Sequence, residues 1–375
     1  MKNYDLVIVG TGVVGLGAAI AAKKLKPKIK ILLIDRHQQC TGASIRNFGF
    51  ITITGLELGI MQKRALRSKE IWLDMCKIAK IPIHHRGLYF LAHHLETLPV
   101  LENYLEADQR SNLKLLSLSE LEKQNQFLSQ TKPHAALYSP DELRIEPRIA
   151  IPKITNYLSQ IKGIDFLWNQ DVIEDLGNAL RTPKKTISYD KLFLATGNHL
   201  QGLGRDLFLK HKVQNCRLHM LKIKPDQSFK LGGGVMSDLT LMRYPGYQNL
   251  DFINAAHRML KKNYKKEIQN GIHLIAVQCA DGSLIIGDSH HYTDHEHLPF
   301  ESEIIDQQIL SLMEKVLGIK NYTVTERWIG HYPSGKDDYF QHFYDRDRVQ
   351  AVVTTGIGMS TGFAFAEETI ERLLN

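Results

Sequence analysis

The chain has 375 residues, of which 43% are hydrophobic and 23% are charged, and its formal net charge is +7. This size and composition are typical of a globular protein with room for two domains, and they exclude a disordered chain. The longest apolar runs are far too short to cross a membrane. The four cysteines are widely spaced and contain no CxxC pair, which favours reduced thiols over a disulfide framework.

The most informative segment is a strand, a glycine-rich turn and a helix near the start of the chain. Asp5 to Val9 is short, apolar and β-branched, which predicts a buried strand. Gly10 allows a tight turn, Gly12 lets backbone N–H groups approach a pyrophosphate, and Gly15 lets helix and strand pack closely. The helix that follows adds a partial positive charge at its N-terminus, which favours phosphate binding.

A second strand, Ile29 to Ile34, ends at Asp35, twenty residues after Gly15. An acidic side chain at this place accepts hydrogen bonds from the ribose hydroxyls of an adenosine and repels a 2′-phosphate. The combination predicts an adenine dinucleotide site. The alternative is a strand–helix turn that binds nothing.

The next part of the chain alternates helices and short strands. We expect helices over 57–80, 95–110 and 146–160, the last interrupted or started late by Pro152, and strands over 87–92, 164–168 and 191–195. Ser119 and Glu122 have the spacing of a capping box. The pairs His84-His85 and His93-His94 are typical of surface histidines.

The segment from about 213 to 330 has an antiparallel character. Strands over 273–278 and 284–287 flank Asp281-Gly282, a strong hairpin signal. A helix over 302–317 and a strand over 321–328 follow. The chain then returns to its first pattern, with a strand over 349–354, glycines at 356, 358 and 362, and a helix that ends at Leu374.

These elements predict an α/β fold with two domains. A discontinuous Rossmann-like domain comprises residues 1–85, 146–212 and 331–375, and it carries an inserted antiparallel-sheet (α+β) domain of residues 86–145 and 213–330. We expect the first domain to bind the dinucleotide and the second to bind the substrate.

Three more stretches belong with the first motif: TGASIRNFGFI at 41–51, YDKLFLATGNH at 189–199 and TTGIGMSTGF at 354–363. With them, nearly the whole chain resembles the FAD-dependent oxidoreductases of the D-amino-acid oxidase, glycine oxidase and sarcosine oxidase type. The resemblance implies bound FAD. It also implies hydride transfer from the carbon next to a neutral amine to the flavin N5, followed by hydrolysis of the imine.

The motifs and the resemblance together predict the residues that contact the cofactor. They are Gly10, Gly12, Val13, Val14, Gly15, Asp35, Arg36, Ala43, Ser44, Asn47, Gly49, Val172, Thr196, Gly197, Gly330, Gly356, Gly358, Met359, Ser360 and Thr361. The N–H groups at the start of the last helix are expected to face the N1 and C2 carbonyl side of the flavin.

The substrate end departs from the pattern of the amino-acid oxidases. In the stretch RWIGHYPS, Tyr332 stands where an arginine usually binds the substrate carboxylate, and a hydroxyl cannot replace a bidentate guanidinium. The segments SIRNFG, RYPGY, IIGDSHHY and RWIGHYPS resemble a subgroup proposed to act on aminophosphonates such as 2-aminoethylphosphonate. The substrate implied is a small amine that carries an acidic group.

We predict that the catalytic and substrate-binding side chains are Arg46, His291, His331 and Tyr332, with His290 as a further anion contact. Arg46 ranks first because it lies in the loop expected beside the flavin; the alternative is a capping or salt-bridging role. Tyr244 and Tyr247 either line the pocket or pack a strand end.

A cluster of histidines and acids around residue 290 has metal-ligand residue types. It contains Asp288, His290, His291, Asp294, His295, Glu296 and His297, but the spacing matches no standard motif. We predict no metal here, and instead a loop near the active site with one histidine that faces the substrate.

The expected partners are a small-molecule amine and an electron acceptor, either oxygen or a quinone. We expect no stable insertion into a membrane, and a cytoplasmic location because the first strand leaves no room for a signal peptide. Two alternatives stay open. One is a flavin-dependent enzyme of tRNA modification, which the lysine-rich faces would suit although no RNA-binding motif is visible. The other is an inactive flavin-binding protein.

Overall fold

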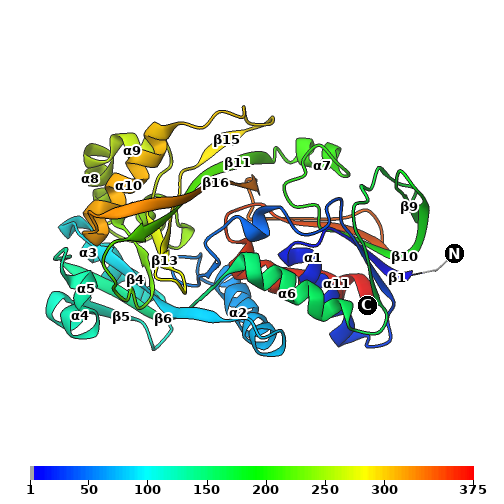
Figure 1. Ribbon diagram of the computed structural model, residues 1–375, viewed down its shortest axis with the longest axis horizontal. Coiled ribbons are helices and arrows are strands. Elements are labelled where there is room, and N and C mark those ends of the chain that lie inside the picture. Colours follow the sequence, from blue (N-terminus) through cyan, green and yellow to red (C-terminus); the bar gives the residue numbers. More distant parts are fainter. Residues whose placement is uncertain (1–3) are drawn as a thin grey trace.

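The computed structural model describes residues 4–375, which form two sheets side by side along the long axis of the molecule (Figure 1). The first sheet, with helices α1 and α11, lies at the right of the view, near both ends of the described chain. The second, with α3, α4, α5, α8, α9 and α10, lies at the left. This is the mixed α/β architecture expected from the sequence.

The first sheet has eight strands, and its main path runs in the order β17-β18-β10-β1-β2-β7. β1, β2, β7, β10 and β18 are parallel, whereas β17 is an antiparallel edge. The bounds are β1 Tyr4–Val9, β2 Ile31–Ile34, β7 Ile164–Leu167, β8 Glu174–Asp175, β9 Ala179–Arg181, β10 Thr186–Leu194, β17 Tyr339–Phe343 and β18 Arg348–Val353. Strands from the start, middle and end of the chain therefore form one sheet.

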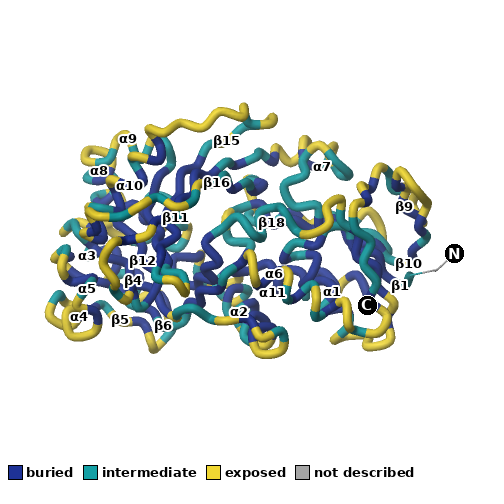
Figure 2. The backbone as a smooth tube through the Cα atoms, in the orientation of Figure 1, coloured by how far each residue is buried: buried dark blue, intermediate teal, exposed yellow. Residues whose placement is uncertain are grey.

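The central strands of this sheet are buried on both faces, as their continuous apolar sequences require. Leu6, Val7 and Ile8 of β1 have no exposed surface. On one face, α1 (Val13–Leu25) packs against α11 (Gly358–Leu374), and Gly17 permits the close approach: a Cβ there would lie 2.8 Å from the Phe363 ring. Figure 2 shows the buried backbone that results.

The second sheet has ten strands, with the main order β15-β11-β14-β13-β12-β4-β6-β3, β16 beside β11 and β5 beside β6. The bounds are β3 Phe50–Ile51, β4 Ile83–Ala92, β5 Lys114–Ser117, β6 Ala135–Ile145, β11 Gln214–Pro225, β12 Gly234–Met236, β13 Ile275–Gln278, β14 Leu284–Gly287, β15 His291–Thr293 and β16 Tyr322–Ser334. All its neighbours are antiparallel except β12 and β4.

The remaining helices connect and cover the two sheets. They are α2 Ile60–Ile78, α3 Leu98–Ala107, α4 Leu118–Gln124, α5 Gln126–Ser129, α6 Pro147–Ser159, α7 Arg205–Lys210, α8 Ile253–Asn263, α9 Lys265–Gln269 and α10 Glu303–Leu317, with short 3-10 turns at Ala43–Ile45, Leu95–Thr97, Asp238–Met242 and Pro245–Tyr247. None of the helices within 4–375 is long and apolar enough to cross a membrane.

The hairpin prediction is confirmed, whereas three other local predictions are wrong. One of these is the break or late start at Pro152, since α6 begins at Pro147 and continues through Pro152. β13 and β14 form the hairpin expected around Asp281-Gly282. The capping box, however, lies two residues earlier than predicted, at Ser117 and Glu120, because α4 begins at Leu118. The histidine pairs are not simple surface residues either: all four of these histidines are partly buried, and burial lowers the pKa of His85 to about 3.

Strand membership crosses the predicted domain boundaries at three points. β3 lies in a segment assigned to the dinucleotide domain but pairs with β6 in the second sheet. β16 runs through the boundary at residue 330, and β4 begins before residue 86. β3 follows β2 of the first sheet along the chain, and β17 of the first sheet follows β16, so β3 and β16 lie at connections between the two sheets. The domain limits themselves stay a prediction.

Candidate active site

The glycine-rich turn after β1 has the close contacts that its sequence predicts. Gly10 has φ of +102°, and a Cβ there would lie 2.2 Å from the Ala195 carbonyl oxygen. A Cβ at Gly15 would lie 1.9 Å from the Gly10 carbonyl oxygen. Both distances are impossible for a side chain, so the turn depends on glycine. Gly12 is the N-cap of α1 and has no side chain to cap the helix, but the Ser44 hydroxyl accepts from the Val13 N–H at 2.9 Å.

Asp35 is held beside this turn by three hydrogen bonds. Its Oδ2 accepts from the Thr11 backbone N–H at 2.9 Å and from the Thr11 hydroxyl at 2.7 Å, and its Oδ1 accepts from the His37 N–H at 3.0 Å. The carboxylate thus has a fixed position at the end of β2, as a ribose contact requires. Thr11, which holds it, was not recognised in the sequence, although it lies inside the glycine motif.

A large cavity opens between the two sheets and holds about 1430 Å³ of empty space, counting the part that is open to solvent. Its walls bring together most of the predicted site residues: Gly12, Val13, Val14, Ala43, Ser44, Arg46, Asn47, Gly197, Gly330, His331, Tyr332, Gly356, Gly358, Met359 and Ser360. These residues come from five separate segments of the chain, at 12–14, 43–47, 197, 330–332 and 356–360, which the fold brings together around one cavity.

The other predicted residues lie outside the cavity lining, for different reasons. Close backbone or helix contacts behind the wall are made by Gly10, Gly15, Gly49 and Thr361. The positions just after strands of the first sheet hold Asp35, Arg36 and Thr196. Val172 packs in a core cluster against that sheet. His291 lies on β15, and its Nε2 is 3.1 Å from Asn270 Oδ1. His290, its neighbour in the chain, lines the cavity in its place.

The structure also adds residues that the sequence prediction omitted. Arg243, His273 and Asp288 line the cavity, as do Phe48, Phe50 and Thr52. Tyr244 lines it too, whereas Tyr247 is fully buried and packs against Tyr104. The hairpin predicted at Asp281-Gly282 contained the signal for His273, since its register brings the residues before β13 beside those after β14.

Arg243 is a cation in the cavity wall. Its Nη2 donates to the Tyr292 hydroxyl at 2.7 Å. Burial opposes its charge, but Tyr332, Tyr292 and Asp288 outweigh this effect and hold the pKa of Arg243 above its ordinary value. Arg46 lies elsewhere on the wall: its Nη1 is 3.5 Å from the Ile329 carbonyl, and its own carbonyl accepts from Trp328 Nε1 at 3.1 Å.

Two histidines of the cavity wall, His290 and His331, are neutral. Burial lowers the pKa of His290 to about 3 and that of His331 to about 4. For Asp288, burial favours the neutral acid, but His290, His273 and Arg243 outweigh it, so the pKa of this carboxyl lies below its ordinary value. Burial raises the pKa of Tyr332 well above its ordinary value, so this hydroxyl keeps its proton. The wall therefore combines one carboxylate, guanidinium cations and neutral donors.

Comparison with known protein families identifies relatives of this chain. The model of the DAO family, described as FAD dependent oxidoreductase, matches residues 5–372. The chain belongs to this family. It is therefore an FAD-dependent oxidoreductase, and FAD is its cofactor.

Individual relatives of this DAO-family chain are distant. The L-2-hydroxyglutarate dehydrogenase of Indibacter alkaliphilus is 20% identical over 236 residues, which is 60% of this chain and only 59% of that protein. The L-proline dehydrogenase of P. horikoshii has a TM-score of 0.78 at 17% identity, covering 99% of this chain and 93% of the other.

Two further structures share the fold at similar identity. The glycine oxidase of Geobacillus kaustophilus has a TM-score of 0.76 at 17% identity, covering 99% of this chain and 95% of that one. The L-α-glycerophosphate oxidase of Mycoplasma pneumoniae, solved with FAD bound, has a TM-score of 0.74 at 18% identity, covering 100% and 96%.

The residues of this chain fit FAD. Two helices begin at the cavity, α1 and α11. The Ser44 hydroxyl accepts from the Val13 N–H of α1, and neither N-cap residue, Gly12 or Ile357, makes a side-chain cap. Other N–H groups at both helix starts are therefore available to phosphate and flavin oxygens. Thr196, just after β10, has a buried hydroxyl without a hydrogen-bond partner within 4–375. Trp72 Nε1 donates to the Met359 carbonyl at 2.8 Å and fixes the start of α11.

Proposed function

We propose that this DAO-family protein oxidises the C–N bond of a small amine that carries an acidic group, giving an imine that hydrolyses. The observation that supports this proposal most directly is the Arg243 guanidinium in the wall of the cavity that also contains the cofactor residues. A partly desolvated guanidinium binds carboxylates and phosphonates through paired, charge-assisted hydrogen bonds.

The substrate end of the cavity offers a further donor for an anion. The Tyr332 hydroxyl lines the cavity and stays protonated. Tyr292 lies outside the cavity lining, where its hydroxyl accepts from Arg243 and so holds the guanidinium in place. These groups compensate for the arginine that Tyr332 replaces in the family pattern. In this proposal Arg243 takes the role of principal anion contact that the sequence suggested for Arg46, and Arg46 adds long-range positive charge.

FAD supplies the acceptor for the hydride when it is bound. The residues of this chain bind and orient the substrate and exclude water from the cavity. The neutral state of His331 suits this role, because a protonated imidazole would oppose the approach of a protonated amine. A general base is not required where the amine arrives in its neutral form.

The names of the relatives support oxidation next to nitrogen, since glycine oxidase and L-proline dehydrogenase share the fold. L-2-hydroxyglutarate dehydrogenase and L-α-glycerophosphate oxidase instead name hydroxylated substrates. A test of the proposal must therefore include hydroxy acids beside amines.

We further propose a phosphonate as the acidic group. The segments SIRNFG and RYPGY, which resemble the aminophosphonate subgroup, contribute Arg46 and Arg243 to one cavity. A phosphonate carries up to two negative charges, whereas a carboxylate carries one. A cavity with two guanidinium groups therefore suits a phosphonate substrate better than a carboxylate substrate.

An anaerobic screen tests this function. The purified protein is mixed without oxygen with 2-aminoethylphosphonate, its N-methyl form, glycine, sarcosine, D-alanine and 2-hydroxyglutarate, and flavin absorbance is followed. We expect the aminophosphonates to bleach the flavin fastest. Bleaching by glycine or sarcosine but not by phosphonates would contradict the phosphonate; bleaching by the hydroxy acid alone would contradict C–N oxidation.

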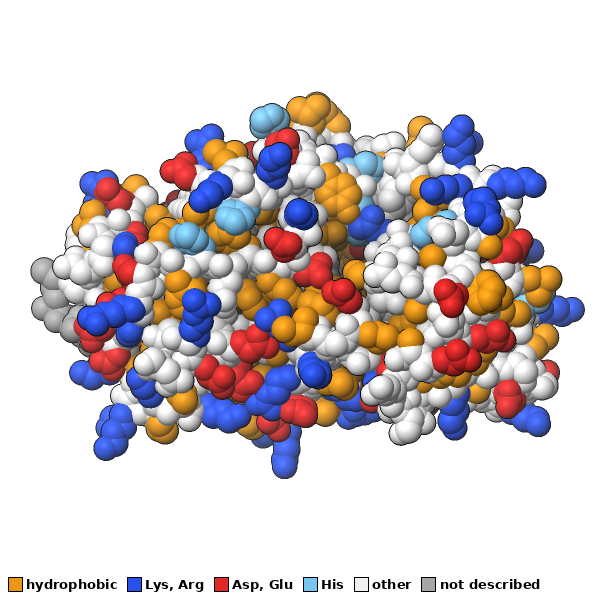
Figure 3. Space-filling view, turned by 180° about the vertical axis from the view of Figure 1, so that it is seen from behind, with side chains coloured by type: hydrophobic (Ala, Val, Ile, Leu, Met, Phe, Trp, Pro, Cys, Tyr) orange, Lys and Arg blue, Asp and Glu red, His pale blue; other side chains and the backbone are white. Residues whose placement is uncertain are grey.

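Other parts of the proposal concern partners and location. Oxygen or a quinone reoxidises the flavin, and the protein is cytoplasmic. A nucleic-acid substrate is disfavoured, because Lys and Arg side chains on the face in Figure 3 are interspersed with Asp and Glu rather than gathered into a patch.

A further inference from the structure

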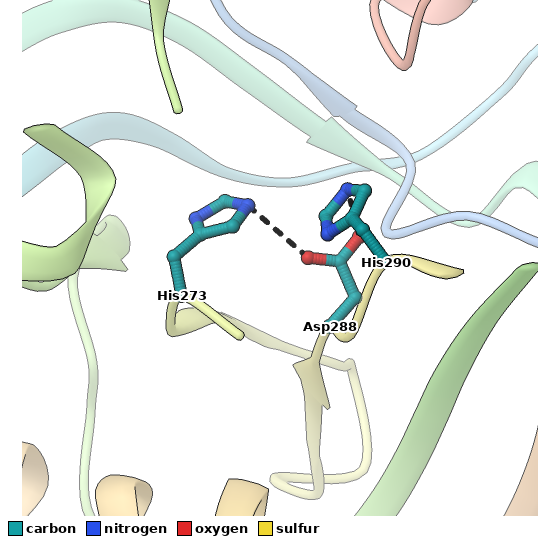
Figure 4. Close-up of side chains that lie close together, drawn as sticks. All are labelled: His273, Asp288 and His290. Carbon is teal, nitrogen blue, oxygen red and sulfur yellow. Dashed lines mark ion pairs between the residues drawn. The ribbon is translucent and has the colours of Figure 1, made fainter. Parts of the chain in front are cut away.

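His273, Asp288 and His290 form a buried cluster on the cavity wall, away from the glycine-rich loops (Figure 4). His273 precedes β13, and Asp288 and His290 follow β14. The Asp288 N–H donates to the His273 carbonyl at 3.2 Å, so the two strand ends hold the side chains side by side. All three side chains are more than nine-tenths buried by exposed area.

The hydrogen-bond pattern fixes which atoms of this cluster can accept. His290 Nδ1 lies 2.9 Å from the Gly271 carbonyl oxygen, which can only accept, so Nδ1 carries a proton. Because burial keeps this ring neutral, Nε2 is an acceptor. This Nε2 lies 3.8 Å from Asp288 Oδ2. Two acceptors thus approach each other without a proton between them.

The second Asp288 oxygen is also available. Oδ1 lies 3.2 Å from His273 Nε2, an ion-pair distance, yet it has no hydrogen-bond partner of good geometry among residues 4–375. A buried carboxylate that lacks donors is unfavourable unless a ligand supplies them. A ligand with two or more N–H donors and a neutral or positive charge would satisfy the Asp288 oxygens and His290 Nε2.

An amine nitrogen meets this requirement. A donor nitrogen about 2.9 Å from each acceptor bridges two atoms that are 3.8 Å apart. Arg243 and Asp288 line the same cavity, so a ligand bound there has access to both the carboxylate and the guanidinium. A ligand with an amine at one end and an acidic group at the other end matches these opposite charges.

We propose that Asp288 and His290 form the subsite that binds the substrate nitrogen, while Arg243 binds the acidic group and His273 positions Asp288. This inference rests on the proposed function and adds the recognition of nitrogen to it. A hydroxy acid of the same shape has a single O–H donor and leaves one acceptor unpaired. The subsite therefore selects primary and secondary amines over the matching alcohols.

The test uses the FAD-loaded enzyme and two kinds of ligand. The first is the amine that bleaches the flavin fastest, for which anaerobic stopped-flow traces give a dissociation constant. The second is ethylphosphonate or propionate, acids without an amine, whose binding is followed by the flavin spectrum. Asp288→Asn is expected to weaken amine binding at least 50-fold and to leave acid binding unchanged or tighter. His290→Gln is expected to weaken amine binding about 10-fold.

Matched controls are available in the same stretch of chain. Asp294 and His295 are exposed and lie outside the cavity lining. Asp294→Asn and His295→Gln are expected to bind both ligands like the parent protein. The flavin content of each variant reports whether it folds, and His290→Gln keeps the test open if Asp288→Asn does not fold.

The outcomes separate the subsite from the proposed function. Normal amine affinity in a flavin-loaded Asp288→Asn or His290→Gln variant overturns the subsite alone. A parent protein that no amine bleaches overturns the proposed function, and the subsite with it. Stoichiometric zinc, iron or manganese in the purified protein, absent from Asp288→Asn, would make the cluster a metal site and overturn the amine assignment.

Discussion

At the scale of single residues, Arg243 is the cation on which anion binding depends in our proposal. Arg243→Met keeps most of the side-chain length and removes the charge. We expect the dissociation constant for the acidic substrate to rise about 100-fold, because a charge-assisted contact to a partly desolvated anion contributes about 2 to 3 kcal/mol. Anaerobic titration of the flavin spectrum measures this change.

The control for Arg243→Met is Arg258→Met, which removes the same charge from the exposed surface of α8. Its substrate affinity is expected to stay within twofold of the parent. If Arg46→Met weakens binding strongly and Arg243→Met does not, the anion contact lies at Arg46, as the sequence alone suggested.

His85 makes the stability of the protein depend on pH. Burial lowers its pKa to about 3, and its Nε2 accepts from the Gln278 N–H at 3.3 Å, a bond that needs the neutral ring. An unfolded histidine has a pKa of about 6.5. The unfolded state therefore binds more protons below this pH, and the free energy of unfolding falls as the pH drops from about 6.5 toward 3.

His85→Gln is expected to flatten this dependence by up to about 1.4 kcal/mol per pH unit, while its glutamine oxygen can still accept from Gln278. Urea unfolding at pH 7, 6 and 5 measures the slope. His134→Gln, at an exposed position, serves as the control. An unchanged slope in His85→Gln would show that this ring is not the source of the acid sensitivity.

At the scale of elements, the sequence predicted what depends on local chemistry. The turn at Gly10 and Gly15 was predictable because neither position can hold a Cβ, and the hairpin at Asp281-Gly282 because this dipeptide favours a tight turn. The capping box was misplaced by two residues because Ser117 and Ser119 both have an acid three residues later. The residue at which β5 ends decides which of the two serines caps α4.

The parts of the site that were missed depend on contacts between elements. The composition around His273 does not differ from that of an ordinary strand start, and only the pairing of β13 with β14 brings it to Asp288. Arg243 lies in a 3-10 turn region whose direction is set by packing on the second sheet. The hairpin signal at Asp281-Gly282 could have pointed to His273, whereas the direction of the turn that carries Arg243 has no signature in a single sequence.

At the scale of the whole molecule, the cavity in which FAD would bind is lined by residues of both sheets. The cavity is lined by α1 and α11 on one side and by β11, β16 and the β13–β14 ends on the other, so FAD binds the folded state alone. We expect removal of FAD to lower the melting temperature by at least about 5 °C, and added FAD to restore it in a concentration-dependent way. Thermal scans of the apoprotein with and without FAD measure the shift. An apoprotein as stable as the FAD-loaded form would contradict this coupling.

The neighbours of β1 have a consequence for synthesis. Its partners in the sheet are β2 and β10, β18 follows beyond β10, and α1 packs on α11, the helix over 358–374. A nascent chain can form the glycine turn early, but the surfaces that complete it leave the ribosome much later. Translation that stops before residue 358 would leave the apolar side of α1 uncovered, and such a fragment would be a target for chaperones and proteases instead of a carrier of flavin.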